Sequence, residues 1–146
     1  MIGIGNDHAG TEIKEAIVKY FKENGIEYKD YGCMDGEKCD YPQKAKEVCD
    51  DVINNTLDKA ILVCGTGIGI SIAANKVKGI RAACCSDYYS AKLTRQHNDA
   101  NVLCMGGRVV GEGLACELVD IFLKTEFEGG RHKTRVDMIT EIENCQ

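Results

Sequence analysis

Short apolar runs alternate along the chain with longer segments in which apolar residues recur every three or four positions. Four of the short runs are almost wholly apolar, which is typical of strands buried on both faces. A fifth alternates apolar and polar residues, as a half-buried edge strand does. In chain order these predicted strands cover residues 1–6, 26–31, 60–63, 80–85 and 101–105.

The segments between the strands carry the helical spacing of apolar residues, together with residues that begin or end helices. Thr11 can cap the first helix and Asn24 and Gly25 can end it, while Pro42 suits the start of the second. The predicted helices begin near Thr11, Pro42, Ile68, Ser86, Glu112 and His132, and they end near Glu23, Ile53, Lys78, His97, Lys124 and Ile142.

Strands and helices thus alternate about five times, which predicts a parallel sheet with helices on both faces. A chain of 146 residues has the size of one domain. We expect residues 1–146 to form a single-domain, Rossmann-like three-layer α/β fold around a five-stranded parallel sheet flanked by helices. Ligands of such sheets bind beyond the carboxyl ends of the strands, so the residues that follow each strand are the first candidates for chemistry.

The predicted strand at 60–63 is followed by Cys-Gly-Thr-Gly-Ile-Gly at 64–69 and then by an apolar helix. Backbone N–H groups at the start of that helix, with the helix dipole, favour an anion. The same position can lower the pKa of a thiol, so Cys64 is a candidate base or nucleophile beside the hydroxyl of Thr66. The glycines match neither the dinucleotide fingerprint nor the P-loop. Taken alone, the turn fits plain strand–turn–helix packing as well as a ligand site.

Other polar residues lie at predicted element ends, and each has a structural explanation beside a functional one. Asp7 and His8 can form a helix-entry turn or face a ligand, and His97 suits a helix end through the dipole alone. Arg131 and Arg135, four positions apart, suit a phosphate or serve as solvated surface charge. The remaining candidates of this kind are Tyr41, Asn98 and Arg108.

Composition narrows the function classes. The net charge of −5 argues against broad nucleic-acid binding, although a local pair of arginines can still hold a small phosphorylated ligand. No apolar run approaches the roughly 18 residues that span a membrane, and the N-terminus lacks the pattern of a signal peptide. We therefore expect a cytoplasmic protein that acts neither on nucleic acid nor on membranes.

Nine cysteines are many for such a chain. They form no C-x-x-C pair, and no Cys/His spacing fits a structural zinc site. Cys84, Cys85 and Cys104 lie within apolar runs, where cysteine packs as a small hydrophobe. We therefore expect reduced, mostly structural thiols, with Cys64 as the exception because of its position.

Seven motifs, in order and spread over nearly the whole chain, resemble those of the type B ribose-5-phosphate isomerases, within the wider group that includes galactose-6-phosphate isomerase subunits. Together they are far more specific than any one glycine turn. They are N-D-H-A-G at 6–10, D-Y-P at 40–42, C-G-T-G-I-G-I-S-I-A-A-N-K at 64–76, G-I-R-A at 79–82, R-Q-H-N-D at 95–99, G-G-R-V-V-G at 106–111 and E-G-G-R-H-K-T-R at 128–135.

The resemblance implies an aldose–ketose isomerase of the pentose phosphate pathway, which interconverts ribose 5-phosphate and ribulose 5-phosphate through an enediolate without metal or cofactor. It implies that Cys64 is the base. Some relatives carry a glutamate at the position of Ile68 and lack the cysteine, so this chain is similar to the cysteine class. The backbone N–H groups of residues 65–69, those of Gly65, Gly67, Ile68 and Gly69 among them, would hold the enediolate oxygens.

The resemblance also implies roles for the other candidates. His97 would open the sugar ring with help from Asp7, and Thr66 would contact the substrate near the reacting carbons. Asn98 and Tyr41 would bind sugar hydroxyls. The phosphate would be held by His8, Arg131 and Arg135, with Arg108 as a weaker candidate.

Relatives of this kind are dimers with shared sites, so the resemblance implies a homodimer, or a pair of such dimers, with composite sites. Three rival functions stay open at this point. One is isomerisation of a hexose 6-phosphate, such as allose or galactose 6-phosphate. The others are a non-catalytic phosphate-binding module and a thiol redox protein, although the absence of C-x-x-C speaks against the last.

Overall fold

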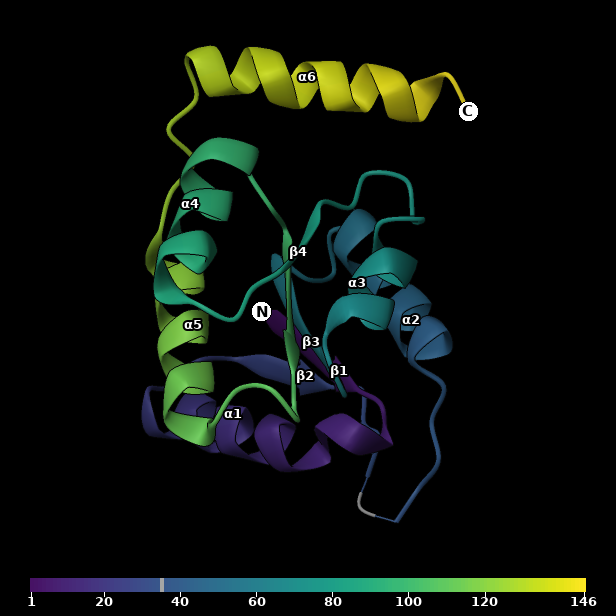
Figure 1. Ribbon diagram of the computed structural model, residues 1–146, viewed down its shortest axis with the longest axis vertical. Coiled ribbons are helices and arrows are strands. Elements are labelled where there is room, and N and C mark those ends of the chain that lie inside the picture. Colours follow the sequence, from purple (N-terminus) through teal and green to yellow (C-terminus); the bar gives the residue numbers. More distant parts are fainter. Residues whose placement is uncertain (35) are drawn as a thin grey trace.

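The structure is a computed structural model that describes residues 1–34 and 36–146. Five parallel strands form one sheet in the order β2-β1-β3-β5-β4 (Figure 1). This arrangement confirms the predicted five-stranded parallel sheet, with the alternating segment at its edge. The strands are β1 (Ile2–Asn6), β2 (Tyr28–Asp30), β3 (Lys59–Cys64), β4 (Ala82–Cys84) and β5 (Val102–Gly106).

Six α-helices connect and follow these strands in the described part of the chain, after a short 3-10 turn, η1 (His8–Gly10). None of these helices is long and apolar enough to cross a membrane. The helices are α1 (Thr11–Glu23), α2 (Tyr41–Ile53), α3 (Ile68–Ala74), α4 (Tyr88–Asn98), α5 (Glu112–Lys124) and α6 (Arg131–Asn144).

Alternate residues of the central strand serve two cores because successive side chains of a strand point to opposite faces. Ile61 and Val63 pack beneath α1, α4 and α5, whereas Leu62 and Cys64 pack beneath α2 and α3. Helix α6 covers neither face. It lies across the end of α4 (Figure 1). The Cys64 side chain therefore emerges on the α2–α3 side of the sheet, where the turn into α3 begins.

The strand β4 and the entry to α1 differ from their predicted forms. Strand β4 is shorter than the apolar run 80–85, and just before it Arg81 N–H donates to the Asn101 side chain at 2.8 Å. Thr11 does not cap α1. It is the first helical residue, and Asp7 caps the preceding η1 by accepting from Ala9 N–H at 2.9 Å.

The cysteines correct two expectations. Cys33 and Cys39 form a disulfide, so these two are not reduced thiols. Their Cα atoms lie 5.9 Å apart, a proximity that their spacing in the sequence does not signal. Cys84 is exposed at the end of β4 and does not pack in the core. The other cysteines are free.

The turn between β3 and α3 lies directly against the end of β5. Gly67 has a φ of +79°, and a Cβ placed on it would lie 2.6 Å from the carbonyl carbon of Met105. Gly106 presents the same constraint from the other side, since its Cβ would lie 2.7 Å from Thr66 C. The backbone of the turn can approach the end of β5 this closely only because both positions are glycine and carry no Cβ.

We predict that Gly67→Ala destabilises the protein by about 2–4 kcal/mol, because it combines a left-handed backbone with a collision against backbone atoms that cannot rotate away. The measurement is urea unfolding followed by far-UV circular dichroism. Gly113→Ala is the matched control. Gly113 lies within α5 with open space around its Cβ, so the change should be neutral or stabilise by up to about 1 kcal/mol. Equal midpoints for Gly67→Ala and wild type would contradict the constraint.

Candidate functional site

The carboxyl ends of β1, β3 and β5 lie side by side in the middle of the sheet. We call the border of the sheet that all strands reach with their carboxyl ends its carboxyl edge, and the opposite border its amino edge. Cys64 ends β3 in register with Gly106 of β5. Backbone bonds join the segments that follow: Asp7 N–H donates to Val63 O at 3.1 Å, and Gly107 N–H donates to Cys64 O at 2.7 Å. This edge therefore gathers the candidates that follow three different strands around one cysteine.

Cys64 is almost completely buried, with 4% of its surface exposed. Its sulfur accepts a hydrogen bond from Gly67 N–H at 3.2 Å, and the hydroxyl of exposed Thr66 accepts one from Ile68 N–H, also at 3.2 Å. Two of the five N–H groups that were expected to face a ligand are thus engaged within the turn. A ligand would therefore bind the remaining N–H groups of the turn, or it would have to replace the two hydrogen bonds that Gly67 and Ile68 already donate.

Tyr41 and Arg108 border the turn on two sides. Tyr41 opens α2 with its ring against Gly69, where a Cβ would lie 2.8 Å from Tyr41 Cζ. The guanidinium of Arg108 extends past Gly65, where a Cβ would lie 3.5 Å from Nη1, and Arg108 N–H donates to Gly65 O. The structure therefore places a phenol and a guanidinium on two sides of the turn that follows Cys64.

Asp7 and His8 lie on the β1 side of the same edge. Asp7 is buried, and one carboxylate oxygen caps η1, so the structural explanation considered for it is correct without excluding a further role. His8 is exposed. Asn6 was not among the residues predicted from the sequence. It is fully buried and donates from its amide to Asp7 O, Thr11 Oγ1 and Cys33 O at 2.8–3.2 Å. Its position, a polar residue at the end of an apolar strand, is the feature of the sequence that could have identified it.

Cys84 was also missed. Its exposed thiol donates to Thr66 O at 3.7 Å, so it lies directly beside the reactive turn. Although Cys84 is exposed by surface area, neighbouring protein atoms partly desolvate its sulfur, and this desolvation, followed by the neighbouring Cys64, raises the pKa of Cys84. Cys84 therefore favours the protonated thiol, which acts here as a weak donor to the turn.

The structure does not bring His97, Asn98, Arg131 and Arg135 to this edge. His97 and Asn98 end α4, where Asn98 O accepts from Arg81 Nε at 2.9 Å, and Arg81 lies just before β4. This position is at the amino ends of the strands, and α6 with both arginines lies over it (Figure 1). The predicted site residues of one chain thus divide between the two edges of its sheet.

His97 stacks on His132, with ring centroids 4.1 Å apart and planes 8° from parallel. His132 is buried, and Glu128 lies 3.5 Å from its Nε2. Burial, and after it the charges of His97 and Arg131, lowers the pKa of His132, despite the opposing effect of Glu128. The sequence analysis gave His132 no role, although it lies within the last of the seven motifs.

Donor atoms of His97, Glu128 and His132 lie within 4.8 Å of one another. The nitrogen lone pairs of two parallel stacked rings lie in separate, nearly parallel planes, so they do not converge on one point. A tetrahedral metal ion needs convergent ligands. The arrangement therefore favours a pair of rings for hydrogen bonding over a preformed metal centre.

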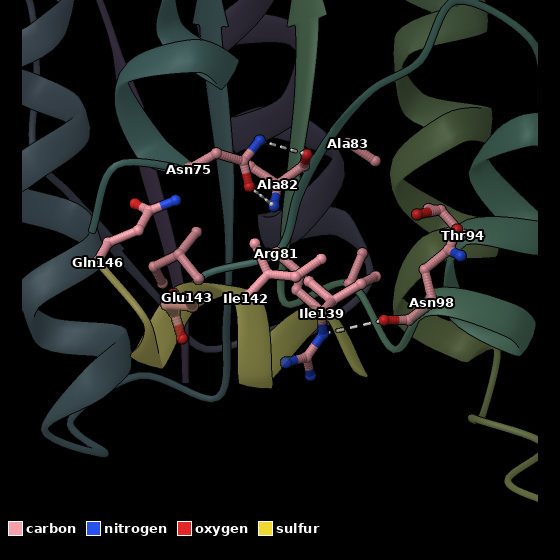
Figure 2. Close-up of a pocket in the computed structure, with 12 residues that line it drawn as sticks. Asn75, Arg81, Ala82, Ala83, Thr94, Asn98, Ile139, Ile142, Glu143 and Gln146 are labelled. Carbon is pink, nitrogen blue, oxygen red and sulfur yellow. Dashed lines mark hydrogen bonds between the residues drawn. The ribbon is translucent and has the colours of Figure 1, made fainter. Parts of the chain in front are cut away.

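A cavity of about 420 Å³ lies beneath α6 at the amino edge, between α6, the start of β4 and the end of α4 (Figure 2). Ile139 and Ile142 form its α6 side, and Arg81 crosses it toward Asn98. Glu143, its one carboxylate, accepts from Gly79 N–H at 2.8 Å. This hollow lies at the opposite ends of the strands from Cys64, and the described residues that line it include no cysteine.

The chain is similar to known proteins over nearly its whole length. Residues 2–139 match the profile of the Ribose/Galactose Isomerase family. The chain is 52% identical over 142 residues to ribose-5-phosphate isomerase B of Escherichia coli, covering 97% of this chain and 95% of that protein. It superposes on ribose-5-phosphate isomerase B of Clostridium thermocellum with a TM-score of 0.95 at 52% identity, covering 98% and 97% of the chains. It also superposes on the Mycoplasma genitalium ribose-5-phosphate isomerase B with bound ribulose-5-phosphate. That match has a TM-score of 0.91 at 43% identity and covers 98% of this chain and 95% of the other.

We predict that stability falls as the pH drops below the ordinary histidine pKa of 6.5, in part through His132. Its folded pKa is lowered, so in this range the unfolded chain binds a proton that the folded chain does not, and protonation favours unfolding. Below the folded pKa this contribution levels off. Urea midpoints between pH 8 and pH 5 should therefore decline less for His132→Asn than for wild type. Parallel curves for the two proteins would contradict the assignment.

Proposed function

The chain belongs to the ribose/galactose isomerase family, and from that premise we propose that it interconverts D-ribose 5-phosphate and D-ribulose 5-phosphate. One observation carries the proposal: the Cys64 sulfur lies at the end of the central strand, in a glycine turn whose Gly67 N–H donates to it. Aldose–ketose isomerisation moves one proton between neighbouring carbons and needs no external electron acceptor. A positioned base and oxyanion donors can therefore perform it.

In the proposed reaction, His97 and Asp7 open the sugar ring, and the thiolate of Cys64 takes the C2 proton. The proton is returned at C1 of the resulting enediolate while the hydroxyl proton of O2 passes to O1, so that the C1 aldehyde becomes an alcohol and the C2 alcohol becomes a ketone. Thr66 and backbone N–H groups of residues 65–69, with Gly65 and Gly69 foremost because Gly67 and Ile68 already donate within the turn, hold the enediolate oxygens. Each such donor contributes about 2.7–4 kcal/mol to transition-state stabilisation, which is why no metal is required.

The phosphate lies away from the reacting carbons and supplies binding energy that positions them. We assign it to Arg131, Arg135 and exposed His8, with Arg108 as a further contact. Guanidinium groups suit this role because they donate two parallel hydrogen bonds to phosphate oxygens. Tyr41 and Asn98 bind the hydroxyls between phosphate and reacting end.

We propose that the active form is a homodimer with two composite sites, alone or as a pair of dimers. In one chain the base and the phosphate-binding arginines lie at opposite edges of the sheet, so a second copy must bring one group to the other. Exposed apolar residues offer a surface for that copy, since a monomer rarely leaves such stripes uncovered. They are Ile68 and Ile72 on α3 and Met138, Ile139 and Ile142 on α6.

We further propose that residues 1–146 act as one domain in the cytoplasm. Sugar phosphates are charged metabolites that do not cross membranes unaided, so an enzyme for them works where they are made. The preference for a pentose over a hexose phosphate is supported by the Escherichia coli and Clostridium thermocellum relatives, which are named for ribose 5-phosphate.

We predict that Cys64→Ala lowers kcat for ribulose 5-phosphate formation by about 10²–10⁴-fold with EDTA present, because it removes the general base and leaves the binding groups intact. KM should change little. Cys145→Ala is the matched control, since Cys145 is an exposed free thiol near the C-terminus and should retain full activity.

Turnover that survives Cys64→Ala would keep the isomerase and move the base elsewhere. The same assay on allose 6-phosphate and galactose 6-phosphate tests sugar preference. A higher kcat/KM on either hexose would replace the pentose assignment. No turnover on any of the three would favour a binding module.

The composite site predicts complementation between two inactive variants. Cys64→Ala and Arg135→Ala, unfolded together and refolded as a mixture, should recover about a quarter of wild-type activity, because half of the random dimers are mixed and each has one intact site. The control pairs Cys64→Ala with Thr66→Ala. Both residues lie at the same edge, so no mixed dimer has an intact site and activity should stay absent. Equal recovery in the two mixtures, or none in the first, would refute the shared site.

A further inference from the structure

The Cys33–Cys39 disulfide lies between two sides of the proposed sugar site. On the β1 side, Cys33 O accepts from Asn6 Nδ2 at 3.1 Å, and Cys33 N–H donates to Asn6 O at 3.0 Å. Asn6 immediately precedes Asp7 and holds Asp7 O with the same amide nitrogen. The backbone at Cys33 is therefore tied to the segment that presents Asp7.

On the other side, Cys39 is two residues before Tyr41, which opens α2 and packs its ring on Gly69 of the reactive turn. The disulfide thus joins the segment anchored at Asn6 to the segment that carries Tyr41. A covalent link of this kind restricts the motion of the two ends relative to each other. It therefore restricts the freedom of Tyr41 relative to Asp7.

The two sulfurs differ in access. Cys33 is fully buried, whereas Cys39 is partly exposed, so an external thiol can approach from the Cys39 side. A disulfide in a reducing compartment is usually transient or redox-sensing and not a permanent structural link. The proposed cytoplasmic setting and the position beside the site therefore point to regulation.

We propose that Cys33 and Cys39 form a reversible thiol–disulfide switch that sets the affinity of the site for the sugar phosphate. This inference rests on the proposed isomerase function. Its redox partner is a low-molecular-weight disulfide such as oxidised glutathione. One cysteine thiolate attacks that disulfide and releases one thiol. The second cysteine thiolate then attacks the mixed disulfide and releases the other thiol. The two electrons pass to the partner's sulfurs and the two protons to the released thiols.

Reduction leaves Cys64 and its turn in place and frees the segment that holds Tyr41. Binding must then order that segment, which weakens binding without altering the chemical step. We expect KM for ribose 5-phosphate to rise by about threefold to tenfold on reduction, with kcat nearly constant. The separation of KM from kcat distinguishes this switch from oxidation of Cys64, which would abolish kcat.

The test equilibrates the whole protein in glutathione buffers of different redox ratios and measures two quantities on each sample. The first is the number of free thiols after denaturation, which should change from nine in the reduced protein to seven in the oxidised one. The second is KM and kcat for ribose 5-phosphate. Cys39→Ser should show the higher KM in every buffer, and Cys145→Ser, which alters an exposed free thiol, should retain the response.

Three outcomes would overturn the switch: a thiol number that does not change, an unchanged KM across a change from nine to seven thiols, or a Cys39→Ser variant that still responds. If the proposed isomerase function is wrong, the result is different. The protein then shows no turnover of ribose 5-phosphate in either redox state, although the number of free thiols still changes.

Discussion

The close approach of the β3–α3 turn to the end of β5 is the constraint on which the site depends. Gly67 and Gly106 let two backbones touch where any side chain would collide with carbonyl and Cα atoms. That contact turns Gly67 N–H toward the Cys64 sulfur and places Thr66 at the surface. The two glycines therefore matter because they lack side chains, and not because they are flexible. Without those side chains, a thiol and a set of N–H donors can lie within one small volume.

A parallel sheet has two unlike edges, and this asymmetry explains why one chain separates its candidate groups. Groups that follow strands collect at the carboxyl edge, and groups that end helices collect at the amino edge. His97 ends α4, so it lies beside Arg81 at the start of β4 and not beside Cys64. Under the proposed function, assembly of two copies is thus a consequence of topology, and the uncovered apolar residues of α6 belong to the same explanation.

The loop between β2 and α2 connects the two flanks of the carboxyl edge. Asn6 holds this loop with the same amide that supports Asp7, and Tyr41 follows directly after it. Under the proposed function, changes in the loop therefore reach the sugar site without moving the central turn, which is held independently by β3 and β5. This division would separate binding from chemistry, with the flanks setting the affinity for the sugar phosphate and the turn carrying the base.

The sequence alone determined the parallel sheet and the order of the helices, because apolar periodicity is a local property of the chain. The glycine spacing marked the turn at 64–69 only as a candidate site. Residues Glu112–Lys124 form a helix as predicted, and Cys64 lies at a strand end as predicted. Only the tertiary structure decided which distant residues meet. It joined Cys33 to Cys39, placed exposed Cys84 beside Thr66, stacked His97 on His132 and moved both away from Cys64. These outcomes depend on how strands are ordered in the sheet and how loops fold back, and no local pattern of residue types encodes either.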